Sequence, residues 1–141
     1  MEIVPYLTFN GKAAEAMTWY AEVLGAEIEA SITYGEMPGM AEHCPAEQKE
    51  LVAHTRLNAG GFRLMASDAP GERYAKPQGT EVCLQVPDPA EAERIYGALS
   101  AGGEVVMALQ ETVWALRFAM FRDRYGTPWM INCEKPMDAK A

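Results

Sequence analysis

The order of elements that the sequence predicts constrains the fold most, because a strand, a helix and three further strands follow one another twice. Both helical segments carry an Ala-Glu-Ala triplet, at residues 14–16 and 90–92, and each places a tyrosine farther along, Tyr20 and Tyr96. Identity between the halves is low, but the shared order of elements predicts an internal duplication. We therefore expect an α+β protein of two βαβββ modules within a single domain, residues 1–141, rather than a doubly wound parallel sheet.

The first module is expected over about residues 1–68, beginning with a strand at Ile3–Phe9. Apolar residues then recur at helical spacing, which predicts a helix over Ala13–Leu24 with Asn10 as its N-cap. A second strand is expected at Glu27–Tyr34, and residues 33–50, which show no clear period, are expected to form a long loop.

Two further strands, Leu51–Leu57 and Phe62–Asp68, complete this module. If Ala59 and Gly60 form the turn, His54 faces Met65 across the hairpin. Alternation then gives one apolar face for the core and one mixed face. The mixed face would carry Val52, His54, Arg56, Arg63, Met65 and Ser67.

The second module is expected over about residues 80–134, after a linker at 69–79 that is rich in Pro and Gly. Its helix is predicted at Ala90–Leu99. The last two strands are apolar runs that flank Tyr125-Gly126, which predicts a hairpin. We interpret the charged residues of this hairpin as a surface cluster and its tryptophans as core residues. The charged residues are Arg117, Arg122, Asp123 and Arg124, and the tryptophans are Trp114 and Trp129.

Charge and cysteine content limit the partners and the compartment. The formal net charge of −8 argues against nucleic acid and against an anionic membrane surface. No apolar run approaches the ~20 residues of a membrane-spanning helix, and no signal peptide is visible. Cys44, Cys83 and Cys133 are odd in number and include no C-x-x-C pair. Reduced thiols and a cytoplasmic location are therefore expected.

Four stretches, in this order and over nearly the full length, resemble the vicinal oxygen chelate superfamily, which includes glyoxalase I, extradiol dioxygenases and the fosfomycin- and bleomycin-resistance proteins. They are PYLTFNGKAAEAMTWYAEVLGAE, HTRLNAGGFRLMASD, VPDPAEAERIYGAL and WALRFAMFRDRYGTPWMIN. Within the superfamily the chain is most similar to the bacterial PhnB-like group, although Ala115 and Ala119 stand where glycines are expected. That group is also labelled a 3-demethylubiquinone methyltransferase domain. The sequence has no Gly-rich loop between strand and helix to hold an adenosyl cofactor.

The resemblance implies the glyoxalase/bleomycin resistance/dioxygenase fold, in which curled mixed sheets form a cleft and the helices lie outside. It also implies a homodimer, for which Trp19 and the loop near Met37–Met40 are candidate contacts. Strand alternation directs Leu7, Phe9, Leu84 and Val86 toward the helices and their neighbours into the cleft. The candidate ligand-binding residues are His54, Glu81 and Asn132 among Tyr6, Met65, Cys83 and Met130, and Val4 and Gln85 should face the same way.

Several roles remain open for these polar residues. His54 is either a general base or a hydrogen-bonded surface histidine. Glu81 is either a catalytic base or a solvated carboxylate at the start of a strand. Asn132 either binds a ligand carbonyl or hydroxyl, or satisfies backbone groups.

Metal-dependent relatives imply metal ligands at the positions that Val4, Met65, Glu81 and Met130 occupy here. Of these four, Glu81 alone is a ligand for a hard or borderline divalent ion. We therefore expect no cofactor and no tightly bound metal. Any metal would use Glu81 and His54. A small-molecule binding protein is the favoured function. A metal-dependent lyase or dioxygenase of the glyoxalase type is the alternative, and a third reading is a protein that binds another macromolecule through its dimer or its loop.

Overall fold

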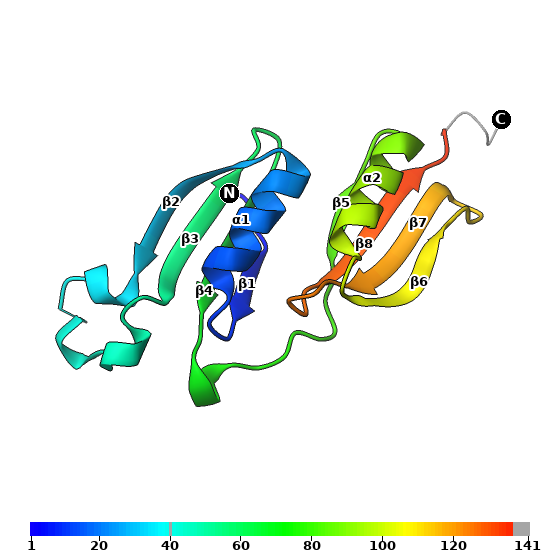
Figure 1. Ribbon diagram of the computed structural model, residues 1–141. Coiled ribbons are helices and arrows are strands. Elements are labelled where there is room, and N and C mark those ends of the chain that lie inside the picture. Colours follow the sequence, from blue (N-terminus) through cyan, green and yellow to red (C-terminus); the bar gives the residue numbers. More distant parts are fainter. Residues whose placement is uncertain (40, 137–141) are drawn as a thin grey trace. The chain divides into compact units, whose positions relative to one another are not determined.

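The computed structural model describes residues 1–39 and 41–136, and the chain forms two compact units, Met1–Lys76 and Pro77–Ala141. In each unit a single helix packs against one face of a four-stranded mixed sheet (Figure 1). This arrangement confirms the predicted α+β class and the βαβββ order. Within the described residues, no helix is both long enough and apolar enough to cross a membrane.

The first unit contains one sheet in the order β1-β4-β3-β2. The first strand pairs in parallel with β4, and the remaining neighbours are antiparallel. Three 3-10 turns lie between β2 and β3, at Tyr34–Glu36, Ala41–His43 and Ala46–Gln48, in the region where the sequence predicted a loop. The strands and helix are β1 (Tyr6–Phe9), α1 (Ala13–Leu24), β2 (Glu27–Thr33), β3 (Val52–Asn58) and β4 (Arg63–Asp68).

The second unit repeats this topology in the order β5-β8-β7-β6, again with its first and last strands parallel. A short 3-10 turn at Gly71–Arg73 precedes the boundary between the units. The strands and helix of the second unit are β5 (Val82–Gln85), α2 (Pro89–Leu99), β6 (Glu104–Gln110), β7 (Ala115–Arg122) and β8 (Pro128–Glu134). Both helices agree with prediction to within one residue at each end.

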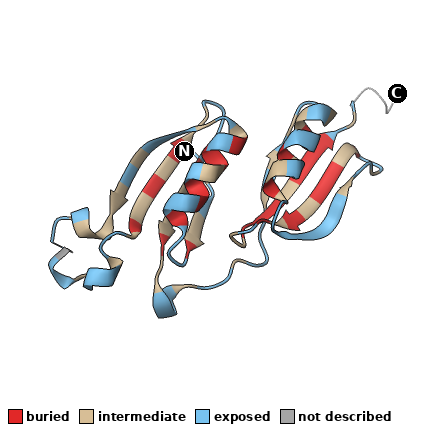
Figure 2. Cartoon of the chain, viewed as in Figure 1, coloured by how far each residue is buried: buried red, intermediate tan, exposed pale blue. Residues whose placement is uncertain are grey.

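Burial follows the alternation of side chains along the strands. In the first unit α1 buries Met17 and Tyr20 against a sheet face that includes Leu57 and Leu64. In the second unit Trp129 and Ile131 of β8 are fully buried on the face that α2 covers. Figure 2 shows the buried residues on the inner side of each helix and along the central strands. The opposite face of each sheet is left without a helix from its own unit.

The start of α1 differs from the prediction. Asn10 is exposed, and Lys12, the residue at the N-cap position, makes no cap hydrogen bond with its side chain. Instead, Oδ1 of Asp68, at the end of β4, accepts hydrogen bonds from the backbone N–H groups of Gly11 (2.9 Å) and Ala13 (3.0 Å). The assignment of Asn10 as the cap was wrong because the capping carboxylate comes from a residue more than fifty positions away.

The β3–β4 hairpin also differs from the predicted register. Its turn lies one residue farther along, at Gly60-Gly61, since the N–H of Ala59 donates to the carbonyl of Phe62. Each residue of β3 thus faces a residue of β4 two positions farther along than predicted. Arg56 therefore faces Met65, and His54 pairs instead with Ile32 of β2. A two-residue shift leaves each strand's faces unchanged. Val52 is nevertheless buried at 3% exposure rather than lying on the mixed face, because a bulge interrupts the β2–β3 ladder beside it.

In the second hairpin, Asp123 is a buried residue, not part of a surface charge cluster. It is 4% exposed, and its carboxylate accepts hydrogen bonds from the N–H groups of Tyr125 (2.8 Å) and Thr127 (3.1 Å) and from the indole of Trp129 (2.8 Å). The carboxylate thus organises the turn and anchors the core tryptophan. Trp129 is a core residue as predicted, but Trp114 is not, since 52% of its surface is exposed.

Candidate functional site

On the open face of the first sheet, three of the candidate residues lie together. Tyr6 on β1 pairs with Met65 on β4, which pairs in turn with Arg56 on β3. His54 lies two residues from Arg56 on the same face of β3. Its Nδ1 lies 3.0 Å from the Tyr6 hydroxyl, and the two rings stack with centroids 5.7 Å apart. Tyr6 is about half exposed, and His54 and Met65 are half-buried.

This pairing determines what His54 offers a ligand. When the Tyr6 hydroxyl donates to Nδ1, the neutral imidazole carries its proton on Nε2 and presents an N–H donor. No other hydrogen bond of His54 occurs within the described residues. The pair therefore offers a polar group held in place by a ring stack, beside the apolar side chain of Met65.

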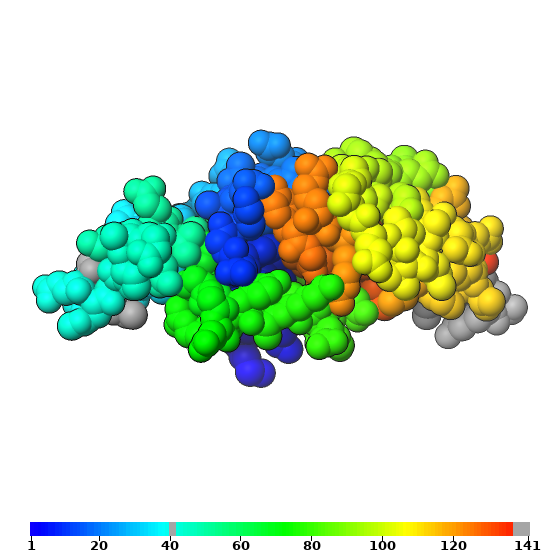
Figure 3. All heavy atoms as spheres, turned by 60° about the horizontal axis from the view of Figure 1, so that its bottom comes forward, coloured from blue at the N-terminus to red at the C-terminus, as the bar shows by residue number. Residues whose placement is uncertain are grey.

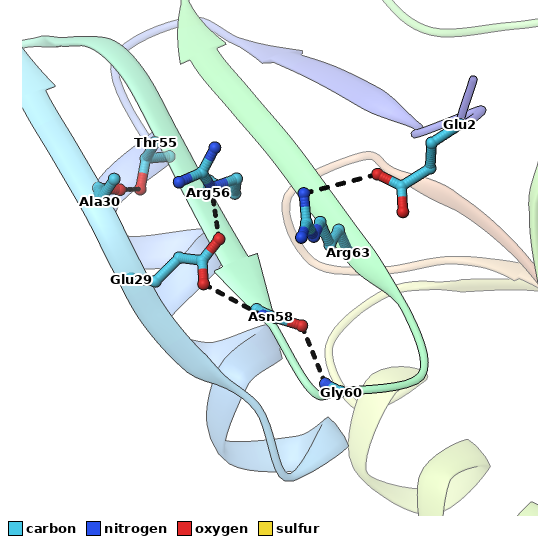
Figure 4. A network of polar contacts seen from close by, with 8 residues as sticks. All are labelled: Glu2, Glu29, Ala30, Thr55, Arg56, Asn58, Gly60 and Arg63. Carbon is cyan, nitrogen blue, oxygen red and sulfur yellow. Dashed lines mark hydrogen bonds and ion pairs between the residues drawn. The ribbon is translucent and has the colours of Figure 1, made fainter.

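Arg56, two residues from His54 on β3, belongs to a charged network (Figure 4). The Glu29 carboxylate lies 2.5 Å from Nε of Arg56 and accepts a hydrogen bond of 3.1 Å from the Asn58 amide. The hydrogen bond from Asn58, with the charges of Arg56 and Arg63 adding to it, holds the pKa of Glu29 below its usual value. Glu29 is therefore ionised near neutral pH and offsets the charge of Arg56. Arg63 lies 3.5 Å from Glu2, so both arginines of this face have acidic partners.

On the open face of the second sheet, Asn132 is the centre of a hydrogen-bond network. Its Oδ1 accepts from the indole Nε1 of Trp114 at 3.1 Å, and its Nδ2 donates to Gln85 at 2.8 Å and to Glu134 at 3.4 Å. The Gln85 amide also donates to Glu134, at 3.2 Å. Asn132 is only 8% exposed, because Trp114 and Phe118 cover it.

Cys83 on β5 pairs with Met130 on β8, and Met130 lies two residues before Asn132 on the same face of β8. Cys83 is an exposed residue, but neighbouring atoms desolvate its thiol. This desolvation, and then the charge of Glu134, raise the pKa of Cys83 above its ordinary value. The thiol stays protonated at neutral pH, which makes it a poor nucleophile and a poor metal ligand.

Glu81 precedes β5 and is exposed. Its side chain lines a hollow of about 110 Å³ with Met120, Arg122 and Trp129, among other residues. Within residues 1–39 and 41–136, Glu81 has no ion pair or hydrogen bond. A second hollow, of about 240 Å³, lies in the first unit between the 3-10 turns and Arg73, where Tyr34 and His43 line it.

The candidate residues thus fall into two local groups. The structure brings Tyr6, His54 and Met65 together, and separately Cys83, Met130 and Asn132. The convergence of these two groups on one ligand stays a prediction. Sequence reasoning missed Trp114 as a site residue, because a tryptophan before an apolar strand is typical of a core. It also missed Glu134, which carries no signal beyond its place on the alternate face of β8.

The donor set fits a divalent metal ion poorly. Of the four positions matched to metal ligands, Val4 offers no donor and Met65 and Met130 offer thioethers, which suit soft ions. In the described part of the chain, no three side chains of His, Cys, Asp or Glu gather as a metal site would require. A hard ion would therefore have Glu81 as its one anionic ligand among these positions.

Comparison with known proteins identifies the family. A model of the glyoxalase/bleomycin resistance protein/dioxygenase superfamily matches residues 2–131. Protein YjdN of Escherichia coli K12 is 37% identical, and the match covers 96% of this chain and 97% of YjdN. The crystal structure of PA1353 from Pseudomonas aeruginosa is 43% identical with a TM-score of 0.84, covering 96% of this chain and 99% of the other.

A PhnB protein from Bacillus cereus shares the fold at 23% identity, with a TM-score of 0.77 over 94% of this chain and 99% of its own. The sequence match, the duplicated βαβββ topology and the structural similarity agree with one another. The chain belongs to the glyoxalase/bleomycin resistance protein/dioxygenase superfamily.

Proposed function

We propose that this chain is a PhnB-like protein that binds a small molecule at the open faces of its sheets without a tightly bound metal. The observation that carries the proposal is the pair of Tyr6 and His54. A hydrogen-bonded polar group, held by a ring stack and flanked by Met65, has the form of a small-molecule site, in which a few placed polar groups orient a mostly apolar ligand. Asn132 supplies a comparable group in the second unit.

A thermal-shift screen of small aromatic and dicarbonyl compounds tests this proposal. A ligand at one hundred times its dissociation constant adds about 2.7 kcal/mol to the free energy of unfolding. His54→Ala and Asn132→Ala should each weaken such a ligand. His43→Ala is the matched control, because His43 is an exposed histidine outside the sheets. A ligand that stabilises both site variants as much as the wild type would show that these faces are not its binding site.

The proposal that no metal is tightly bound rests on the kinds of side chain at the four positions matched to metal ligands, and it has a separate test. A single carboxylate, Glu81, should hold a divalent ion only weakly. We expect elemental analysis, after dialysis against a chelator, to find less than stoichiometric Zn, Ni, Mn or Fe. Stoichiometric metal would contradict this expectation.

The second candidate function is a metal-dependent lyase or dioxygenase of the glyoxalase type. The observation in its favour is the exposed Glu81 carboxylate, which lines a hollow and has no described partner. Under this alternative the protein retains a metal ion, and Glu81→Ala releases it. If the metal is retained in Glu81→Ala, this ligand assignment is wrong.

A further inference from the structure

The exposed Trp114 is the starting point, because a large aromatic side chain with half of its surface in solvent can contact a ligand. Its backbone is held on both sides: the N–H of Lys135 donates to the Trp114 carbonyl at 3.0 Å, and the N–H of Ala115 donates to Oγ1 of Thr112 at 3.0 Å. The side chain is held as well, by the hydrogen bond from Nε1 to Asn132 and by edge-on contact with Phe118 at 5.2 Å between centroids. The indole is therefore fixed in orientation while 52% of Trp114 remains exposed.

A fixed, exposed indole suits a flat partner. Stacking on an aromatic ring that is already oriented loses little conformational entropy on binding. The hydrogen bond to Asn132 also satisfies the polar edge of the indole, so that the rest of the ring is free to meet an apolar surface. The geometry of Trp114 alone thus favours a planar aromatic ligand.

The charges nearby decide which kind of aromatic ligand fits. Glu134 accepts hydrogen bonds from Gln85 and Asn132, and it has no cationic partner in the part of the chain that the structure describes. Two nearby cations are already paired: Lys135, which follows β8, lies 2.9 Å from Glu111, and Arg117 on β7 lies 3.1 Å from Glu93. The surroundings of Asn132 are therefore negative, which favours a cation and disfavours a carboxylate.

We propose that Trp114, Asn132 and Glu134 form a subsite for a planar aromatic cation. The ring of the ligand stacks on the indole, where the face of a tryptophan attracts positive charge, and its N–H donors reach the Glu134 carboxylate. This subsite rests on the proposed function, since it names the ligand class for the face that carries Asn132. It makes Trp114 and Glu134 the residues that determine specificity.

A matched set of three small probes tests the ligand class. Benzamidinium has the ring and the charge, cyclohexanecarboxamidinium has the charge without the aromatic ring, and benzoate has the ring with the opposite charge. Binding is followed by NMR through the indole N–H signals, with Trp114→Phe identifying the signal of Trp114. We expect benzamidinium to shift this signal saturably and to bind at least tenfold more tightly than either of the other probes.

Variants then test the residues. Glu134→Gln, which keeps the shape of the side chain, should weaken benzamidinium several-fold, and Trp114→Leu should weaken it at least tenfold, as followed through the backbone amide signals of β8. Trp19→Phe, in the first unit, is the control and should leave the affinity unchanged. Equal binding of all three probes, or no shift of the Trp114 signal at saturating benzamidinium, would overturn the subsite.

The outcomes separate this subsite from the function on which it rests. A ligand from the thermal-shift screen that loses affinity in His54→Ala and Asn132→Ala, but not in Trp114→Leu or Glu134→Gln, supports the proposed function and refutes the subsite. Binding of benzamidinium that depends on Trp114 and Glu134 supports the subsite, even where no screened compound responds to His54→Ala.

Discussion

At the scale of single residues, two buried aspartates organise the ends of the strands. Asp68 is 1% exposed and accepts hydrogen bonds from three backbone N–H groups, those of Gly11, Ala13 and Val52. It thereby ties the start of α1 and the start of β3 to the end of β4. Asp123 has the corresponding role within the turn of the second unit, through two backbone N–H groups and the indole of Trp129.

The first prediction concerns Asp68. Asp68→Ala leaves the three N–H groups without their acceptor, and each unsatisfied buried donor costs about 1–3 kcal/mol. We expect the free energy of unfolding to fall by at least ~3 kcal/mol, measured by urea denaturation. Asn10→Ala is the control, and it should change the stability by less than ~0.5 kcal/mol because Asn10 caps nothing. A loss on Asn10→Ala as large as that on Asp68→Ala would contradict the assignment of the cap.

The second prediction concerns Cys83, whose pKa desolvation and Glu134 raise above its ordinary value. The rate of alkylation by iodoacetamide, followed against pH, should rise with a midpoint above that of an unperturbed cysteine, since the thiolate is the reactive form. Glu134→Gln should lower this midpoint only part of the way, because desolvation is the larger cause and remains. Because the folded pKa is raised, Cys83 stabilises the fold fully below its unfolded pKa, and this stabilisation is lost as the pH rises through the folded pKa.

At the scale of the elements, each sheet has an edge strand that is interrupted by bulges. The edge strand β6 exposes Val105, Val106 and Met107, and its atoms lie on the surface of the second unit (yellow in Figure 3). Its register against β7 shifts twice, between Val105 and Met107 and again before Gln110. Bulges of this kind twist an edge strand and hinder its pairing with other chains. β2, the edge strand of the first sheet, is also bulged, between Ile28 and Ala30.

The third prediction compares Gly97, within α2, with Gly103, the residue before β6. A Cβ on Gly103 would lie within 2.9 Å of the Asp123 backbone and still closer to the carbonyl oxygen of Arg122, so Gly103→Ala should force β6 away from β7. Gly97 lies inside α2, is exposed, and would place a Cβ in open space. Gly97→Ala should raise the free energy of unfolding by about 0.5–1 kcal/mol, and Gly103→Ala should lower it by more than ~2 kcal/mol. Thermal or urea unfolding measures both changes in the free energy of unfolding. Equal changes in the two variants would contradict the close approach at Gly103.

At the scale of the whole molecule, we propose a homodimer, which the family resemblance implies. Trp19 on α1 is half-buried and the segment near Met37 is partly exposed, whereas Met40, the other end of the expected contact, lies outside the described residues.

The fourth prediction is that light scattering at tens of micromolar protein gives twice the mass of one chain. Trp19→Ala should shift the equilibrium toward monomer, and Trp114→Leu, in the second unit, is the control with no expected effect. A monomeric mass at these concentrations would count against the dimer.

Local patterns along the chain were enough to predict the elements and their order. Helical spacing predicted α1 and α2 to within one residue, and the repeated order of elements predicted two βαβββ modules. Alternation predicted the faces of the strands, except at the bulge beside Val52. These features depend on residues that are near one another in the chain, where the periods of 3.6 and 2 residues separate the buried face from the open one. The motifs spread along the chain likewise identified the superfamily.

Contacts between residues that are distant in the chain could not be predicted in this way, because they depend on the three-dimensional fold. No local pattern indicates that Asp68 caps α1, that a turn at Gly60-Gly61 pairs Arg56 with Met65, or that Trp114 lies exposed over Asn132 rather than in the core. A buried donor is satisfied by whichever acceptor the fold brings near it. The register of a hairpin depends on backbone hydrogen bonds in its loop, and most side chains in the loop do not determine these bonds. The chemistry of the candidate site depends on these long-range choices, because His54 and Asn132 acquire their partners only after the sheets have formed.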